Sequence, residues 1–312
     1  MTIDMHGHSY WPKSESEAFW DWLARLEVDN DPTKTVEWVK ENILPTYWDP
    51  DGEILLKRMD KAGIEKTVLL ATDMYMDEFR DTPLTIEEYN KHISDLAKKY
   101  PDRLIYFCGL DPRRPKATEL LEKFYHEFGA RGLKLYPPCG WDLDDRVVYP
   151  FYESCAAWGI PILPHMGPEP LPFKGEHTHP SHLEKPLKDF PNLIFIAAHL
   201  GLEYWRDLIA LGKSHKNVMA DFSYWQVNAV NRYGLFCHIL RRFLDEFGAD
   251  RVLFGTDGPA AESILPSDKW VELIKNLPNN PPEEKQFTKE EVSAILDGNA
   301  RRVLSMSNSA HT

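Results

Sequence analysis

The 312-residue chain lacks several features that mark whole classes of protein. It has no run of about 18 apolar residues, so no membrane-spanning helix is expected. Basic residues are in deficit, at 36 against 49 acidic ones, and the formal net charge is −13. This balance argues against nucleic acid or an anionic membrane surface as the main partner, and leaves a small-molecule substrate.

Cysteine is also scarce. The four cysteines, Cys108, Cys139, Cys155 and Cys237, form no Cys-x-x-Cys pair and no zinc-knuckle spacing. We expect free thiols in a reducing compartment. The chain opens on an apolar strand, without the charged and apolar segments of a secretory signal peptide, so a cytoplasmic location is predicted. Nothing in the sequence decides whether the chain forms a homo-oligomer.

What the chain does contain is a regular alternation of short apolar segments and helical segments, with 43% hydrophobic residues. The expected strands start at Ile3 and continue over 66–71, 104–110, 130–135, 160–164, 193–198, 218–222 and 251–254. Buried apolar strands that alternate with helices favour a parallel (β/α)₈ barrel of the TIM type. A doubly wound open sheet is the alternative, disfavoured because no Gly-x-Gly-x-x-Gly turn follows a strand.

We predict one domain over residues 1–312, with an insertion or cap at 9–50 and a C-terminal helix and tail at 288–312. The insertion holds half of the ten tryptophans, namely Trp11, Trp20, Trp22, Trp38 and Trp48. Packing in a satellite core is the favoured interpretation, because buried aromatic residues are usually structural. A cap over a pocket is the alternative.

Polar residues stand at the ends of five expected strands. They are His6 and His8, Lys134 and Tyr136, His165, His199, and Asp257. Catalytic residues of a (β/α)₈ barrel lie at the C-terminal ends of its strands, so these side chains are expected at one rim. His6 and His8 point to the same face of a regular strand, and neutral imidazoles bind divalent metals. Desolvating so many polar groups without a function would be costly.

The chain resembles the amidohydrolase superfamily, in the amidohydrolase-related branch that includes aminocarboxymuconate semialdehyde decarboxylase. The resemblance rests on His6-x-His8, His165, His199, Phe254-Gly255-Thr256-Asp257 and Gly298-Asn299-Ala300-Arg301-Arg302-Val303-Leu304. It implies one divalent metal ion held by His6, His8, His165 and Asp257. Zn²⁺ is the first choice, with Mn²⁺ and Fe²⁺ left open. It also implies that His199 and Asp257 are the catalytic acid/base groups.

Three further residues are predicted to bind substrate. Lys134 is expected to point into the barrel with Tyr136 and to bind a substrate anion; a carboxylated lysine that bridges two metals and a lysine at the barrel rim are its alternatives. Arg113, after the third strand, could clamp a carboxylate, although a surface arginine is the simpler interpretation. His177, His179 and His182 follow His165 in a loop and are expected to be exposed.

The predicted activity is hydrolysis of a small carboxylated cyclic or aromatic-derived substrate by metal-activated water. Non-oxidative decarboxylation on the same scaffold is the alternative, and a barrel that only binds a ligand is a third. The residues after His199 decide which of these activities is ranked first. They lack the glycine run, proline and Gly-Arg pair of the decarboxylases, although Arg206 could still supply a cation. Glu203 would oppose a second substrate carboxylate near the rim.

Overall fold

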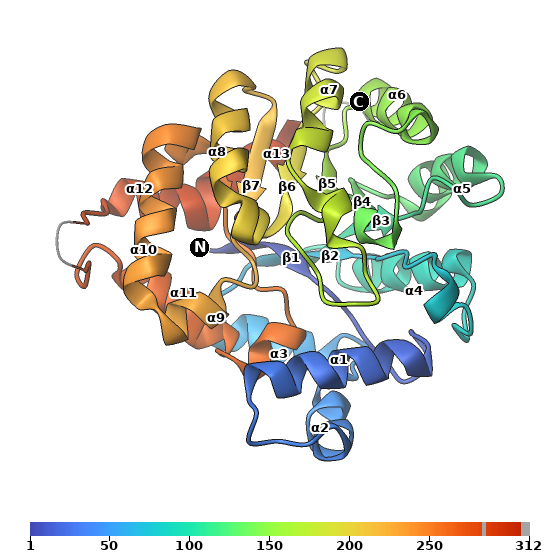
Figure 1. Cartoon of the computed structure of the whole chain (residues 1–312), viewed down its shortest axis with the longest axis horizontal. Helices are drawn as coiled ribbons and strands as arrows, with labels where there is room; N and C mark the ends of the chain where they lie inside the picture. Colours follow the sequence, from blue (N-terminus) through green and yellow to red (C-terminus); the bar gives the residue numbers. More distant parts are fainter. Residues whose placement is uncertain (283–284, 307–312) are drawn as a thin grey trace.

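The structure, a computed structural model, describes residues 1–282 and 285–306 and contains one eight-stranded parallel sheet (Figure 1). Its strands are β1 (Ile3–Gly7), β2 (Lys66–Leu70), β3 (Leu104–Gly109), β4 (Leu133–Leu135), β5 (Ile162–Pro164), β6 (Phe195–Ala197), β7 (Val218–Asp221) and β8 (Val252–Leu253). Each strand pairs with the next in parallel. Met5 N donates to Phe254 O at 2.9 Å, and Asp257 N donates to His6 O at 2.7 Å. These bonds join the end of β8 to β1, so the predicted (β/α)₈ barrel is confirmed.

Helices surround the sheet, as Figure 1 shows. They are α1 (Glu17–Asn30), α2 (Val36–Asn42), α3 (Glu53–Ala62), α4 (Ile86–Lys99), α5 (Ala117–Lys123), α6 (Tyr149–Trp158), α7 (Ser181–Asp189), α8 (Trp205–Ser214), α9 (Gln226–Asn231), α10 (Tyr233–Arg242), α11 (Ser267–Asn276), α12 (Lys289–Ser293) and α13 (Asn299–Met306). Thr85 and Glu88 form a capping box at the start of α4. Gly63 ends α3 at φ 69°, which glycine adopts without strain. None of the helices in the described ranges has the length and apolarity that a membrane span needs.

The barrel interior is filled by apolar side chains that alternate along the strands. They include Ile3 and Met5 of β1, Val68 and Leu70 of β2, Leu163 of β5 and Met219 of β7. Ala300, Val303 and Leu304 of α13 belong to the same cluster. Val303 lies beside Ile160 and Ile194, which precede β5 and β6, so α13 covers the end of the barrel where the strands start. The opposite end, where the strands finish, remains for the functional site.

Residues 9–50 form α1, α2 and the short turn η1 (Leu44–Tyr47) between β1 and α3. Trp20 is buried against Tyr10, with ring centroids 5.7 Å apart, whereas Trp38 is 44% exposed. The packing role predicted for this segment thus holds for only some of its tryptophans. That the segment is an insertion, and that the whole chain is one domain, remain predictions. Of the predicted C-terminal tail, residues 307–312 lie outside the described residues.

Candidate active site

A β-bulge in β1 directs the side chains of His6 and His8. Asp4 pairs with Thr67 and Gly7 pairs with Leu69, so β1 has one more residue than β2 over this stretch. Met5 points into the barrel interior, and regular alternation would turn His6 away from it. The extra residue shifts the alternation by one position, so that His6 also points inward; bulges near active sites often redirect a side chain in this way. His6 and His8 consequently both face a cavity at the C-terminal ends of the strands.

That cavity measures about 310 Å³ and has both polar and apolar residues in its lining. The polar residues include His6, His8, Lys134, Tyr136, His165, Glu169, His199 and Asp257. The apolar residues include Phe19, Trp22, Leu23 and Leu26 of α1, with Met74, Leu202 and Val227. Among the five tryptophans of residues 9–50, Trp22 alone lines the cavity. In this segment α1 lines the cavity, and a cap role for residues 9–50 remains a prediction.

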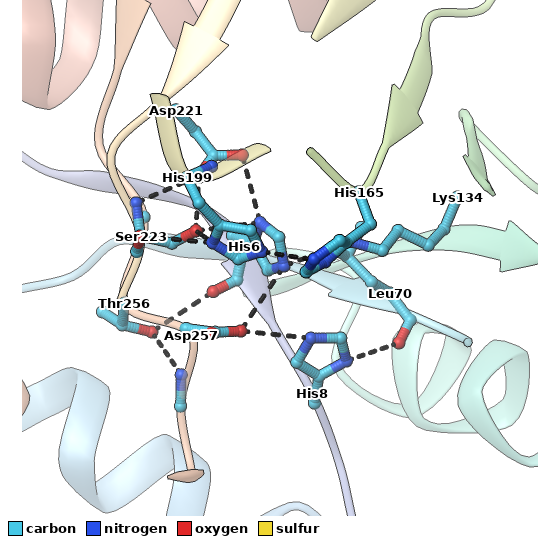
Figure 2. Close-up of polar contacts among 12 residues, drawn as sticks. His6, His8, Leu70, Lys134, His165, His199, Asp221, Ser223, Thr256 and Asp257 are labelled. Atoms are coloured by element: carbon cyan, nitrogen blue, oxygen red, sulfur yellow. Dashed lines mark hydrogen bonds and ion pairs between the residues drawn. The ribbon is translucent and has the colours of Figure 1, made fainter. Parts of the chain in front are cut away.

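Three of the four predicted metal ligands converge in the structure (Figure 2). Asp257 Oδ1 lies 3.4 Å from His6 Nε2 and 3.3 Å from His8 Nε2. Each of the three residues offers a ligand atom within 4.8 Å of the other two. His8 Nδ1 lies 3.1 Å from the carbonyl oxygen of Leu70, which can only accept, so Nδ1 carries the proton and Nε2 keeps its lone pair. Such a hydrogen bond orients a metal-binding histidine.

Asp221, at the end of β7, orients His6 in the same way, although the sequence analysis did not single it out. His6 Nδ1 donates to Asp221 Oδ2 at 3.0 Å. Burial lowers the pKa of His6 to about 3, so the imidazole is neutral and its lone pair lies on Nε2. Burial alone would raise the pKa of Asp221, but His6 and Ser223 hold it below its usual range. The signal was present in the sequence, because Asp221 ends an apolar strand just as His165 does.

His165 and His199 form a second oriented pair. His199 Nδ1 lies 3.2 Å from the carbonyl oxygen of Ser223 and donates to it, so Nε2 is an acceptor. That atom lies 3.2 Å from His165 Nδ1, which must therefore be the donor. His165 is left with a lone pair on Nε2, a buried atom without a hydrogen-bond partner in the described chain. Glu169 Oε1 lies 3.2 Å from it, outside hydrogen-bond geometry.

Lys134 enters the cavity from β4, as alternation along that strand predicts. Its side chain is 2% exposed, and Nζ lies 3.3 Å from His6 Nε2. Burial lowers the pKa of Lys134 to about 8, against the opposing effect of Asp221, Asp257 and Glu169. Tyr136 also lines the cavity and donates to Glu169 at 3.1 Å. Glu169 follows β5 in an irregular loop, where no periodic pattern points to it.

Arg113 is not brought to this cavity. Its guanidinium binds both oxygens of Asp111, at 2.9 and 2.7 Å, and donates to the carbonyl oxygens of Tyr75 and Cys139. Because the Arg113 guanidinium already binds Asp111, the prediction that Arg113 binds substrate is corrected. Arg206 is also absent from the cavity lining and lies over the Trp205 ring at 4.1 Å.

The backbone around the cavity is unusually strained. Six non-glycine residues of the described chain have a positive φ, and all but Lys116 stand at or next to the cavity wall: His199, Leu200, Leu202, Tyr224 and Asp257. Left-handed φ values in such residues cost free energy and concentrate at functional sites. The strain around His199 ends only at Leu202, and α8 starts at Trp205.

The site suits the single divalent metal ion that the sequence predicts. Its donors are imidazoles and a carboxylate, and His165, with its orphaned Nε2, lines the same cavity as the other three. The structure supports candidate metal-binding residues without identifying the ion. The assignment of His6, His8, His165 and Asp257 as ligands, and of His199 and Asp257 as catalytic groups, remains a prediction.

Comparison with solved structures confirms the fold over the whole chain. An uncharacterized TIM-barrel protein from Bordetella bronchiseptica shares 23% identity at a TM-score of 0.70, covering 98% of this chain and 99% of its own. A 2,6-dihydroxybenzoate decarboxylase shares 19% identity at 0.68, covering 97% and 99%. A manganese-bound 5-carboxyvanillate decarboxylase from Novosphingobium aromaticivorans shares 17% identity at 0.68, covering 97% of each. A search of curated proteins found no match.

These comparisons overturn the predicted preference for hydrolysis. Among the similar structures with a named activity are decarboxylases of 2,6-dihydroxybenzoate and 5-carboxyvanillate and a 4-oxalomesaconate hydratase from Rhodopseudomonas palustris. They favour the decarboxylase alternative. The argument from Glu203 fails for a physical reason: this side chain lines the cavity but is exposed to water, which screens its charge.

A sequence model of one family matches nearly the entire chain. The match extends over residues 3–306 and is described as amidohydrolase. It includes β1 with its histidine pair, every later strand, and α13 at the far end. The chain therefore belongs to the amidohydrolase family and is an enzyme of the amidohydrolase superfamily.

Proposed function

We propose that this enzyme is a metal-dependent decarboxylase that removes CO₂, without oxidation, from a small hydroxylated aromatic acid. The observation that carries the proposal is the cavity lining, which combines the cluster of predicted metal ligands with apolar side chains of α1. A carboxylate loses CO₂ more readily once it is taken out of water, and an apolar wall removes that water. The named decarboxylases with this fold act on such acids.

The size and polarity of the cavity support a substrate with one ring. Its volume of about 310 Å³ lies at the small end of the range for ligand pockets. Two residues of its lining, Thr72 and Trp22, each carry a buried polar atom, Oγ1 and Nε1, that has no hydrogen-bond partner in the described chain. Buried polar groups normally have a partner. Hydroxyl or methoxy groups on the substrate ring would supply these partners.

The reaction exchanges a carboxylate for a proton on one ring carbon. A divalent cation at His6, His8, His165 and Asp257 would hold anionic oxygens of the substrate and stabilise the charge that develops on them. A protein carboxylate takes a proton from a hydroxyl group of the substrate and passes it to the ring carbon, and the phenolate left behind regains a proton from solvent when the product leaves. The bond from that carbon to the carboxylate then breaks, its electron pair returns to the ring, and CO₂ leaves.

We assign the proton transfer to Asp257. Both ring nitrogens of His199 already contact protein groups, Ser223 O and His165 Nδ1, each at 3.2 Å. Asp257 uses Oδ1 toward His6 and His8, and its carboxylate lines the cavity. His199 then acts by orienting His165. Lys134 remains the cation that binds an anionic oxygen of the substrate.

The test is a panel of hydroxylated and methoxylated benzoic acids, including 2,6-dihydroxybenzoate and 5-carboxyvanillate. Metal-free protein is loaded with Zn²⁺ or Mn²⁺ in separate samples, and CO₂ in the headspace is measured beside product mass. Equal amounts of CO₂ and decarboxylated acid support the proposal. A product that gains the mass of water and releases no CO₂ would show a hydratase and refute it.

A further inference from the structure

Tyr224 lines the cavity but has no part in the reaction proposed above. It follows the last residue of β7 by three positions, and its side chain is partly buried. Asn30, the last residue of α1, also lines the cavity, and its Nδ2 donates to Tyr224 Oη at 3.1 Å. The phenol oxygen is thus an acceptor in this bond. Its own proton remains free, because no acceptor for it is found among residues 1–282 and 285–306.

The backbone holds Tyr224 at the cavity in a strained conformation. Its φ is 65°, in the left-handed region that a bulky residue rarely adopts. Both neighbours are fixed: Ser223 N donates to Asp221 Oδ1 at 3.0 Å, and the next residue, Trp225, donates from Nε1 to the carbonyl oxygen of His199 at 2.6 Å. Such strain persists only where the surrounding structure determines it, and it concentrates at sites that bind a ligand. The conformation therefore indicates a role for Tyr224 inside the cavity.

The end of α1 that carries Asn30 is also fixed. Glu27, one turn earlier in the helix, is buried and accepts a hydrogen bond from Ser263 Oγ at 2.9 Å. Tyr47 donates its hydroxyl to the other oxygen of the same carboxyl group. These contacts join the C-terminal end of α1 to η10 (Ala260–Ser263), the turn after β8. The Asn30 amide is consequently held beside Tyr224.

A phenol in this environment is a hydrogen-bond donor toward a ligand. Burial raises the pKa of Tyr224, and the carboxylates of Glu169 and Asp257 raise it further, so the hydroxyl keeps its proton at neutral pH. The same carboxylates disfavour a second anionic group beside it. An ether or carbonyl oxygen is neutral and can only accept, which suits the free proton. We propose that Tyr224 is a further substrate-binding residue, oriented by Asn30, which donates a hydrogen bond to a neutral acceptor oxygen on the substrate ring.

This inference rests on the proposed function in placing an aromatic acid in the cavity, and its test measures binding instead of turnover. Three matched pairs of benzoic acids carry either a methoxy or an ethyl group at the second, third or fourth ring position. The two groups have nearly the same shape, but only methoxy has an acceptor oxygen. Calorimetry on the full-length, Mn²⁺-loaded enzyme gives Kd for each acid. We expect the wild type to bind at least one methoxy acid about 3- to 10-fold more tightly than its ethyl partner.

Two variants test the donor and its orientation. Tyr224→Phe should remove the preference for methoxy, because the phenol proton is lost. Asn30→Asp should remove it as well, since a carboxylate can only accept and would take the hydrogen bond of the Tyr224 hydroxyl. Tyr75→Phe is the matched control, because Tyr75 is exposed and lies outside the cavity lining. This control should keep the wild-type preference.

Equal Kd values for the two members of every pair in the wild type, or a preference that survives in Tyr224→Phe, would overturn the inference. A preference that survives in Asn30→Asp would refute the orienting role of Asn30. Failure of the proposed function gives a different result. A preference that depends on Tyr224, in an enzyme that releases no CO₂ from any acid, would support the inference and refute the decarboxylase.

Discussion

Replacing Asp221 by asparagine tests the orientation of the predicted metal ligands. Asp221 is fully buried and accepts hydrogen bonds from His6 Nδ1 at 3.0 Å, Ser223 N at 3.0 Å and His199 N at 3.3 Å. It also accepts from Ser223 Oγ. Asparagine offers one oxygen and one NH₂ group in place of two acceptors. The NH₂ group must therefore face either His6 Nδ1 or the backbone N–H groups of Ser223 and His199, and each of these needs an acceptor.

Either orientation of the amide is unfavourable. If NH₂ faces His6, Nδ1 must accept, and the ring proton moves to Nε2, which removes the ligand lone pair. If NH₂ faces Ser223 and His199, buried N–H donors lose their partner at about 1–3 kcal/mol each. Loss of an orienting partner typically weakens metal binding about 10- to 100-fold. At about 1.4 kcal/mol per tenfold, that corresponds to about 1.4–2.8 kcal/mol.

The assay titrates metal-free Asp221→Asn with Mn²⁺ or Zn²⁺ in competition with a chromophoric chelator. Asp95→Asn is the control, because Asp95 is an exposed residue of α4 paired with Lys91 and loses the same charge. The control should bind metal with wild-type affinity. Wild-type affinity in Asp221→Asn as well would refute the orientation argument.

Four further changes test other parts of the account. Lys134→Met should raise KM for the acid and leave the metal content unchanged; loss of a second metal ion would instead indicate a carboxylated lysine bridging two ions. His199→Ala should weaken metal binding about 10- to 100-fold, as expected of a group that orients His165, and full metal retention with loss of turnover alone would contradict this role. Thr72→Val should raise KM about fivefold for hydroxylated substrates and leave analogues without that hydroxyl unaffected, as competition between the two in one assay would reveal. A methyl group at Gly109 would lie 2.0 Å from Ala71 O, so Gly109→Ala should lower the free energy of unfolding by about 3 kcal/mol in urea titrations, whereas Gly234→Ala, with open space around it, should be neutral or stabilising.

The strands and most helices could be predicted because their signals are local. Apolar runs of strand length and helix caps such as Thr85 and Gly63 sit inside the elements that they specify. The positions of functional residues at strand ends follow from the barrel, so the histidines and Asp257 could be grouped before any contact was known. The bulge in β1 could not be predicted, because it depends on how β1 pairs with a strand about 60 residues away.

Other parts of the site depend on partners that are distant in the sequence. Asp221 gains its role only through His6, 215 residues away, and Glu169 only through the folding of an irregular loop over Tyr136. The substrate-binding role predicted for Arg113 does not hold for a local reason: Asp111, two residues earlier, binds its guanidinium. A charged residue with an oppositely charged neighbour on the same turn is a weak candidate for substrate binding.

The proposed function depends most on Asp257, itself one of the predicted metal ligands, which passes a proton to the carbon that loses CO₂. The direct measurement is turnover of a hydroxybenzoate by the metal-loaded enzyme in D₂O, with CO₂ and product deuterium measured together. We expect one deuterium on the carbon that carried the carboxylate for each CO₂ released, and a turnover rate that is lower by about 10²-fold or more in Asp257→Asn. Product formation without CO₂, or an Asp257→Asn variant that turns over at the wild-type rate, would contradict it.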